Sequence, residues 1–185
     1  MARKYSQLSD EHIEFINHQK LYFVGTAADE GCINVSPKGL DSLRVLSPNR
    51  IVWLNLTGSG NETAAHLAQN DRMTIMFCAF DGEPKILRVY GKAKAIHPRD
   101  SQWDEMAALF EPSISARQYV ELEFDLVMTS CGFGVPFYDY KQKRDNMEKW
   151  NNRKGEQGIK DYWRDRNQIS IDGLPTHILD EEEES

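Results

Sequence analysis

Short apolar runs, some alternating with polar residues and some continuous, dominate the chain from residue 21 to residue 127 and predict strands. Seven runs share this character: 21–27, 32–35, 43–46, 50–56, 72–80, 85–96 and 117–127. Spacers rich in Gly, Pro, Asn and Asp separate most of them, which indicates tight turns between antiparallel neighbours. In the last run, Val120, Leu122, Phe124 and Leu126 alternate with Glu121, Glu123 and Asp125. This pattern predicts a strand with one buried face and one polar face.

Three short helices are expected around these strands. The first begins after Ser9, a favourable N-cap that is followed by two acidic residues, and runs to about His18. Leu8 and Ile13 are spaced to form a hydrophobic staple across its start. Two further helices are expected at about 61–69 and 98–110.

The order of these elements restricts the fold. Six or seven mostly consecutive strands with two or three short helices cannot alternate as a parallel sheet requires, because each crossover needs about a dozen residues. We therefore predict a mostly β domain over residues 1–140, a closed or nearly closed antiparallel barrel with accessory helices. Residues 141–179, which are polar and helix-forming and then extended, are predicted to pack on the barrel or on a partner through Trp150 and Trp163. Residues 180–185 are predicted to be a disordered acidic tail.

Composition narrows the function. The 185 residues, 40% of them hydrophobic, suit one compact domain, and the net charge of −7 disfavours general nucleic-acid binding. Residues 141–166 nevertheless hold nine Lys/Arg against five Asp/Glu, which leaves open a solvated helix face or a local anion or RNA contact. No apolar run approaches the ~20 residues of a membrane span and the start lacks a signal-peptide pattern, so we expect a cytoplasmic protein. The scattered cysteines and histidines have no metal-ligand spacing, and no protein-bound metal is expected.

Residues 51–63 form an apolar strand, a small-residue loop and a helix start. Gly58 and Gly60 let the backbone approach a ligand, while Asn61, Thr63 and free helical amides can donate hydrogen bonds to an anion. A P-loop would need Lys-Ser/Thr after its last glycine, and a dinucleotide fingerprint would need a third glycine where Thr63 stands. A phosphate site and a glycine-rich turn capped by Asn61 both remain compatible with this segment.

A second segment, residues 34–39, ends a strand-like run with a hydroxyl, a proline, Lys38 and a glycine. Lys38 is placed to neutralise a phosphate or a reduced flavin ring. Arg44 and Arg88 are further cations within predicted strands, and the alternation of each strand decides whether they face the interior or solvent.

Taken together in this order, these segments resemble the pyridoxamine 5'-phosphate oxidase-like family of FMN-binding split barrels. The resemblance covers about residues 8–140 and is carried by Phe23-Val-Gly-Thr26, 34–39, 51–63, Ala64-Ala-His-Leu67, Asn70-Asp-Arg72 and Leu87-Arg-Val-Tyr-Gly91. Residues 130–136 are similar to a loop of one uncharacterised branch. The resemblance implies an antiparallel split β-barrel and a homodimer with FMN at its interface.

The resemblance also implies which residues contact FMN. Those expected along the flavin are Val35, Ser36, Pro37 and Lys38, those beside the ring system are Leu54 and Asn55, and those near the phosphate are Gly60, Asn61, Glu62 and Thr63. The oxidase branch has a Ser-Arg-Lys cluster near the phosphate, whereas this chain has neutral donors and one acid. Lys38, with Arg44 or Arg88, would then supply the positive charge.

The loop 129–140 is rich in aromatic and apolar residues. Its members Phe133, Val135, Phe137, Tyr138 and Tyr140 are expected either to wall the substrate pocket or to fill the dimer core.

The implied function is an FMN-dependent oxidoreductase that moves hydride or electrons between a donor such as NAD(P)H and a small-molecule acceptor. Because a flavin carries the redox chemistry itself, the sequence assigns no catalytic residue. The vitamin-making oxidases end in Arg-Leu-x-Pro where this chain has Asp172-Gly-Leu-Pro175, which argues against pyridoxamine 5'-phosphate oxidation. A non-catalytic dimer that binds or senses flavin, haem or another ligand, and a deazaflavin-dependent reductase, remain as alternatives.

Overall fold

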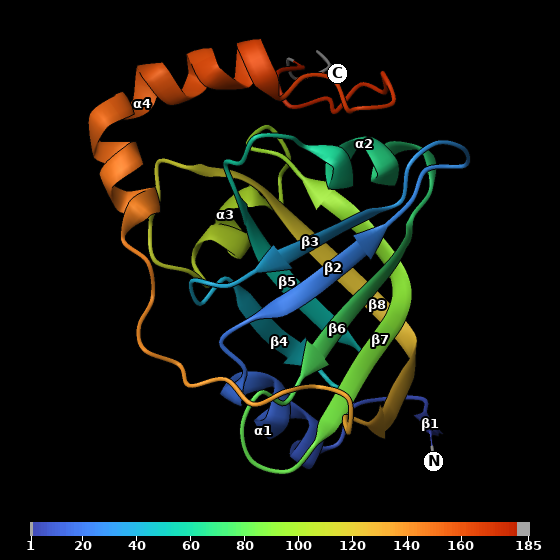
Figure 1. The fold of residues 1–185 in the computed structure, drawn as a ribbon. Coiled ribbons are helices and arrows are strands. Elements are labelled where there is room, and N and C mark those ends of the chain that lie inside the picture. Colours follow the sequence, from blue (N-terminus) through green and yellow to red (C-terminus); the bar gives the residue numbers. More distant parts are fainter. Residues whose placement is uncertain (1, 181–185) are drawn as a thin grey trace.

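The computed structural model describes residues 2–180, which form one curled antiparallel sheet with four helices (Figure 1). The strands are β1 (Arg3–Tyr5), β2 (Tyr22–Thr26), β3 (Asn34–Lys38), β4 (Leu43–Ser47), β5 (Arg50–Leu56), β6 (Arg72–Cys78), β7 (Lys85–Ile96) and β8 (Ala116–Cys131). The helices are α1 (Asp10–His18), α2 (Glu62–Gln69), α3 (Trp103–Ala107) and α4 (Asn146–Arg166).

The strand order is β3-β2-β6-β7-β8-β5-β4, with β1 paired to the end of β8. Every pairing is antiparallel, and the edge strands β3 and β4 are not paired with each other. The prediction of a mostly β, antiparallel split barrel is therefore confirmed. The strand that the sequence did not predict is β1.

Most elements lie close to their predicted bounds. Ser9 caps α1, because its hydroxyl accepts the N–H of His12 while the His12 ring accepts the N–H of Ser9. The third helix covers only Trp103–Ala107, shorter than the predicted 98–110. The reason is a turn after β7, where the carboxylate of Asp100 accepts the N–H of His97 and holds residues 97–100 outside helical geometry.

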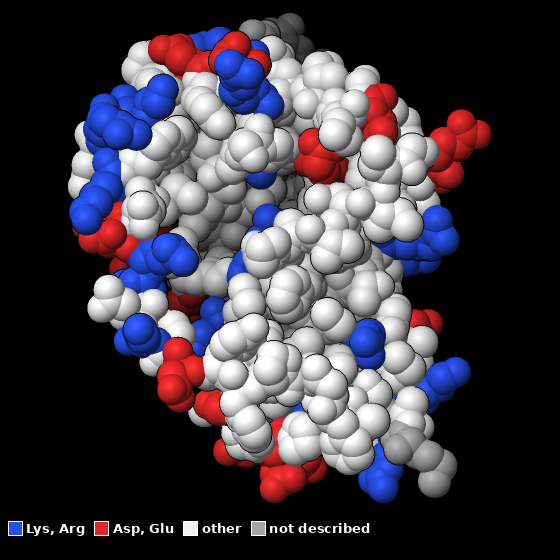
Figure 2. Space-filling model, viewed as in Figure 1, with Lys and Arg blue, Asp and Glu red and all other residues white. Residues whose placement is uncertain are grey.

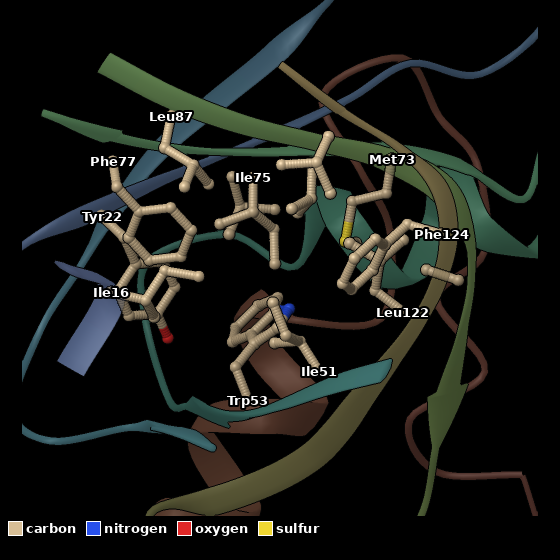
Figure 3. Close-up of a cluster of buried hydrophobic side chains, with 14 of the residues drawn as sticks. Ile16, Tyr22, Ile51, Trp53, Met73, Ile75, Phe77, Leu87, Leu122 and Phe124 are labelled. Carbon is tan, nitrogen blue, oxygen red and sulfur yellow. The ribbon is translucent and has the colours of Figure 1, made fainter. Parts of the chain in front are cut away.

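Two cores lie on opposite faces of the sheet. The larger core fills the barrel interior with side chains such as Trp53, Phe77 and Leu122 (Figure 3). The second lies between the outer face of β5, β7 and β8 and the helix α3, and includes Met106 and Tyr119. Strand β5 contributes to both cores and is therefore buried on both faces.

The predicted polar face of β8 needs a correction. The register between β7 and β8 shifts at Gly91, where an added Cβ would lie 2.0 Å from a backbone oxygen of β8. The shift changes the phase of the alternation, so Phe124 and Val127 both face the core. Glu121, expected in solvent, is only 3% exposed and pairs with Arg50 and Lys94.

The C-terminal extension, residues 141–180, leads from the α1 end of the barrel, where Lys143 lies, to the opposite end, which α4 and the residues after it cover (Figure 1). There the N–H of Ile171 donates to Glu62 at the start of α2. Helix α4 is kinked at Gly155, whose φ of +64° favours glycine. Its second half and the following turn form a small core from Ile159, Trp163 and Ile178. From residue 181 onward, the predicted acidic tail lies outside the described residues.

Candidate functional site

Buried polar side chains gather near the split of the barrel, on the edge strand β3 and on the neighbouring parts of β5 and β8. On β3, Lys38 places its ammonium 4.9 Å from the ring centre of Trp53 on β5. On the neighbouring strands, Asn55 and Gln118 are register partners whose side chains share a 2.9 Å hydrogen bond. Trp53, Asn55 and Gln118 lie on strands that the hydrophobic pattern predicts, whereas Lys38 ends β3, three residues beyond the predicted run 32–35. The sheet fixes the relative positions of all four.

Arg117, the second residue of β8, brings a second cation to this place. It is 3% exposed, and its guanidinium donates to the side-chain oxygens of Asn167 at 2.8 Å and Asn55 at 3.4 Å. Neither Arg117 nor Lys38 has a carboxylate within ion-pair distance in residues 2–180. Two cations without an acidic partner favour binding of an anion.

The pKa values reflect this environment. Burial lowers the pKa of Lys38 to about 8, and the nearby charge of Arg117 acts in the same direction. Burial also lowers the pKa of Arg117 to about 10, while Tyr162 and Glu62 partly oppose the effect. Both groups remain protonated at neutral pH, at a desolvation cost that an anionic ligand would offset.

Several buried donors here have no partner among the described residues. The unpartnered atoms near this cluster are Trp53 Nε1, Asn61 Nδ2, Arg117 Nε, Gln118 Nε2 and the hydroxyl of Ser36. The four nitrogen atoms can only donate, and each buried unsatisfied donor costs about 1–3 kcal/mol. We refer to Lys38, Trp53, Asn61, Arg117 and Gln118 as the anion site, because it offers donors and positive charge to a ligand rich in acceptors.

The glycine loop before α2 borders the anion site. Asn61 is the N-cap residue of α2, but its side chain makes no capping hydrogen bond, so its amide remains available to a ligand. Glu62 turns away, because its Oε2 accepts the N–H of Ile171 at 3.1 Å. Gly60 leaves room for this carboxylate, since an added Cβ would lie 2.9 Å from Glu62 Oε1. Thr63 faces Asn34, which lies 3.4 Å away at the start of β3.

The C-terminal extension holds both the loop and Arg117. Asn167, fully buried, accepts from Arg117 and donates to the carbonyl of Gly58 at 3.1 Å. The indole N–H of Trp163 donates to the Thr57 hydroxyl at 2.8 Å. Residues far apart in the sequence thus fix the position of the buried guanidinium.

Arg44, predicted to contact the phosphate, is engaged elsewhere. Its Nη1 and Nη2 donate to the carboxylate of Asp41, and its Nε donates to the carbonyl of Leu109 at 3.1 Å. Leu40 and Asp41 have φ values of +61° and +56°, which are strained for side-chain-bearing residues. In this structure, Arg44 therefore stabilises the loop after Lys38.

Other predicted residues lie on the outer face of the barrel or away from the split. Arg88 lies between two core residues of β7, so it faces outward and donates to the Ser130 hydroxyl. Val35 and Pro37 lie on the exposed row of β3, and Leu54 lies in the core beside α3. A single chain does not bring these residues to the anion site, and their contact with FMN stays a prediction.

The aromatic loop also lies elsewhere in the single chain. Phe133, Phe137 and Tyr138 are exposed and Val135 is partly buried. Tyr138 donates its N–H to the carbonyl of Phe80, which places this part of the loop at the β6–β7 turn. Tyr140 borders a separate cavity of about 590 Å³ beside α1 and β4. Within one chain, the loop does not wall a pocket at the anion site, and its role in a substrate pocket stays a prediction.

Sequence reasoning missed Trp53, Arg117, Gln118 and Asn167. The available signal was the alternation of β8, because extending it backwards places Gln118 in the same row as Val120 and Leu122, which fill the core. A polar residue at such an inward position indicates a site.

The molecular surface is hollowed between α4 and the barrel, with Lys and Arg atoms on the walls (Figure 2). In this region, a cavity of about 540 Å³ separates the loop 57–59 from α4. Residues 2–180 contain no group of three or more His, Cys, Asp or Glu side chains placed to hold a metal ion. Within the same range, no helix is long and apolar enough to cross a membrane.

Comparison with known proteins gives three kinds of match. Residues 8–131 match the family model described as pyridoxamine 5'-phosphate oxidase. The curated pyridoxamine 5'-phosphate oxidase family protein ustO of Aspergillus flavus is 40% identical over 140 residues, which are 73% of this chain and 56% of that protein. The matched region therefore spans little more than half the length of this relative.

Solved structures share the fold at low sequence identity. HupZ of Group A Streptococcus is 17% identical, with a TM-score of 0.53 and coverage of 65% of this chain and 91% of its own. A candidate pyridoxamine 5'-phosphate oxidase from Lactobacillus delbrueckii is 20% identical, with a TM-score of 0.53 and coverage of 66% and 93%. An FMN-binding protein from Syntrophomonas wolfei is 13% identical, with a TM-score of 0.50 and coverage of 63% and 82%.

Proposed function

This chain belongs to the pyridoxamine 5'-phosphate oxidase family, and from that premise we propose that it binds FMN at the anion site and acts as a flavin-dependent oxidoreductase. The observation that carries the proposal is the group of buried, unpartnered donors around Lys38 and Arg117. A structural neighbour described as an FMN-binding protein supports the choice of cofactor.

The residues present fit FMN. The phosphate needs positive charge and donors, which Lys38, Arg117 and Asn61 supply. The ring carbonyls need neutral donors, which Trp53 and Gln118 supply. The only acid in the glycine loop, Glu62, is hydrogen-bonded to the backbone of Ile171, although its charge still acts on Arg117.

When bound, FMN supplies the hydride and electron transfer that no side chain can perform. The chain's own residues bind it, orient it and exclude water. Asn167 and Trp163 hold the Arg117 guanidinium and the loop 57–58 in place, so the donors are preorganised. As sequence reasoning also implies, we propose a donor such as NAD(P)H and a small-molecule acceptor.

We also propose a homodimer. The outer face of the barrel is poor in charge over β2, β3 and β6 (Figure 2), and Ile33 and Val35 there are 76% and 65% exposed. Half-buried apolar residues continue this face on neighbouring strands: Phe23, Met76, Tyr90, Leu126 and Met128. Monomeric proteins rarely expose so continuous an apolar surface. In a dimer, Arg88 and the aromatic loop would have a second chain against which to act.

Pyridoxamine 5'-phosphate is not the proposed substrate. Asp172, in the segment where the vitamin-making oxidases carry their substrate-gripping pattern, accepts the N–H of Cys32 at 2.8 Å and is engaged in holding the loop before β3. We expect negligible turnover of this compound by FMN-loaded protein in an oxidase assay, and robust turnover would contradict the assignment.

The binding proposal is tested by calorimetric titration of the flavin-free protein with FMN and with riboflavin, which lacks the phosphate. We expect FMN to bind at least ten-fold more tightly, and Arg117→Gln to remove most of that preference, because a buried charged contact is worth about 2–5 kcal/mol. The matched control is Arg72→Gln, an exposed arginine at the start of β6. Equal affinity for the two flavins would refute the phosphate site, and no binding of either would refute the flavin proposal.

The oxidoreductase proposal is tested separately. Anaerobic addition of NADH or NADPH to FMN-loaded protein should bleach the flavin absorbance, and an acceptor should restore it. Two negative results together would favour the non-catalytic binding protein. Neither nicotinamide would reduce the flavin, and flavin reduced by dithionite would not pass its electrons to any acceptor tried. Mass spectrometry of the copurified small molecule would distinguish FMN from a deazaflavin.

A further inference from the structure

We propose that the cleft between the loop 57–59 and α4 binds a nucleoside diphosphate, either the ADP half of FAD or the ADP half of a nicotinamide dinucleotide; the choice of these two sources rests on the proposed flavin function. The cleft has a volume of about 540 Å³, within the range of about 300–1,000 Å³ typical of small-molecule pockets. Its walls are the loop 57–59 and part of α4, including Lys149, Trp150, Arg153 and Tyr162.

The charge of the cleft suits phosphate. Lys149 and Arg153 line it, and none of its lining residues is acidic, although the whole chain carries a net charge of −7. Lys149 pairs with Asp145, which lies outside the lining, at 2.7 Å. Arg153 is exposed and makes no ion pair with any residue of the described range 2–180. Its guanidinium is therefore free to donate two parallel hydrogen bonds to phosphate oxygens.

The aromatic side chains suit a base. Trp150 and Tyr162 meet edge to face, with ring centres 5.3 Å apart, and both are only partly buried. In a straight α-helix, residues twelve apart would be separated by about 18 Å along the axis. The kink at Gly155 brings the two rings together, and an added Cβ at Gly155 would meet nothing within 4 Å. Gly155 is thus required for its backbone conformation, and that conformation creates the aromatic wall on which a planar base stacks.

The cleft adjoins the anion site through one residue. Gly58 lines the cleft, and a Cβ added to Gly58 would lie 3.9 Å from Arg117 Nη2. Gly58 therefore places the wall of the cleft within van der Waals reach of the Arg117 guanidinium. A ligand with a phosphate at Arg117 can therefore extend toward Arg153, as the second phosphate and adenosine of FAD would, or a separate dinucleotide can lie beside the bound flavin.

The test uses the full chain and ADP as the first probe. We expect calorimetry to detect ADP binding to flavin-free protein. Trp150→Ala should weaken it about ten-fold by loss of stacking, and Arg153→Gln about five-fold by loss of one partly solvated charge contact. Arg166→Gln, an exposed arginine of α4 outside the cleft, is the matched control and should change nothing. Because Arg153 is exposed, its substitution tests the cleft without disturbing the core.

FAD, FMN and NADPH then identify the source. If FAD binds more tightly than FMN and Arg153→Gln removes the difference, the cleft holds the second half of FAD. If FAD and FMN bind equally, and Arg153→Gln weakens NADPH binding to FMN-loaded protein, the cleft holds the dinucleotide. Flavin binding without any ADP binding, or ADP binding insensitive to both cleft variants, overturns this inference and leaves the proposed function intact. ADP binding that responds to the variants in a protein that binds no flavin refutes the proposed function but supports the cleft.

Discussion

Replacing Lys38 by methionine should stabilise the flavin-free protein while weakening its binding of FMN. The ammonium of Lys38 is partly buried beside Arg117, and no carboxylate of residues 2–180 pairs with it. A buried charge of this kind lowers the stability of the flavin-free protein, and it strengthens the binding of an anion. Methionine keeps the length and apolar character of the side chain and removes the charge.

The magnitude follows from the pKa of Lys38, which falls from 10.5 to about 8 on folding. A difference of about 2.5 units corresponds to about 3 kcal/mol, at 1.36 kcal/mol per unit. The unfolded chain holds the proton more tightly, so the full cost is present below pH 8 and fades as the pH rises from 8 to 10.5. The contact of Lys38 with Trp53 offsets about 0.5–1 kcal/mol. Lys38→Met should therefore gain about 2 kcal/mol at pH 7 and little at pH 10.5.

The assay is urea unfolding of flavin-free protein at pH 7 and pH 10.5, at one fixed protein concentration, followed by circular dichroism. Lys160→Met, an exposed lysine of α4, is the control. In parallel, the variant should lose at least ten-fold more affinity for FMN than for riboflavin. A variant that is less stable than the parent at pH 7, or that loses FMN and riboflavin equally, would refute the assignment of Lys38 to a desolvated phosphate contact.

Three further variants test the surroundings of the site. Glu62→Gln should change FMN affinity less than about two-fold, because the carboxylate is turned toward the N–H of Ile171; marked tightening in a titration would place it beside the phosphate. Asn167→Ala should weaken FMN binding about ten-fold and speed hydrogen exchange of the amides of residues 57–61, because it removes the contacts to Arg117 and Gly58. Unchanged exchange would count against this positioning role. Leu126→Glu should convert the proposed dimer to a monomer in light scattering, and a persistent dimer would exclude this face as the interface.

Much of the fold follows from local pattern. The N-cap at Ser9, the two-sided burial of β5 and the turns between strands are local properties, and the sequence predicts the corresponding elements to within a few residues. Which residues of β8 face the core does not follow from local pattern, because it depends on where the register between β7 and β8 shifts. Gly91 on β7 permits that shift, and nothing within β8 itself indicates that Phe124 and Val127 share a face.

The candidate site is predictable only in part, for the same reason. Lys38, Asn55 and Asn61 lie in segments whose composition points to a ligand. The role of Arg117 depends on Asn167, fifty residues later in the sequence. It also depends on the split between the edge strands β3 and β4, which form no pair with each other. Arg44 is a candidate cation by its sequence, but its guanidinium is hydrogen-bonded to Asp41 and Leu109 and is not available to a ligand. Charge in the sequence identifies candidates, but unpaired buried donors select among them.

The position of β5 between β4 and β8 has a consequence for synthesis of the chain. β5 is apolar on both faces and pairs with β4 as soon as that hairpin forms, but its other edge waits for β8. Fifty-nine residues lie between the end of β5 at Leu56 and the start of β8 at Ala116, and a ribosome needs roughly 3–12 s to add them. During that interval, the nascent hairpin presents an unpaired apolar edge that can join other chains. The yield of folded protein should therefore be more sensitive to chaperone supply and to translation rate between residues 56 and 131 than to either elsewhere in the chain.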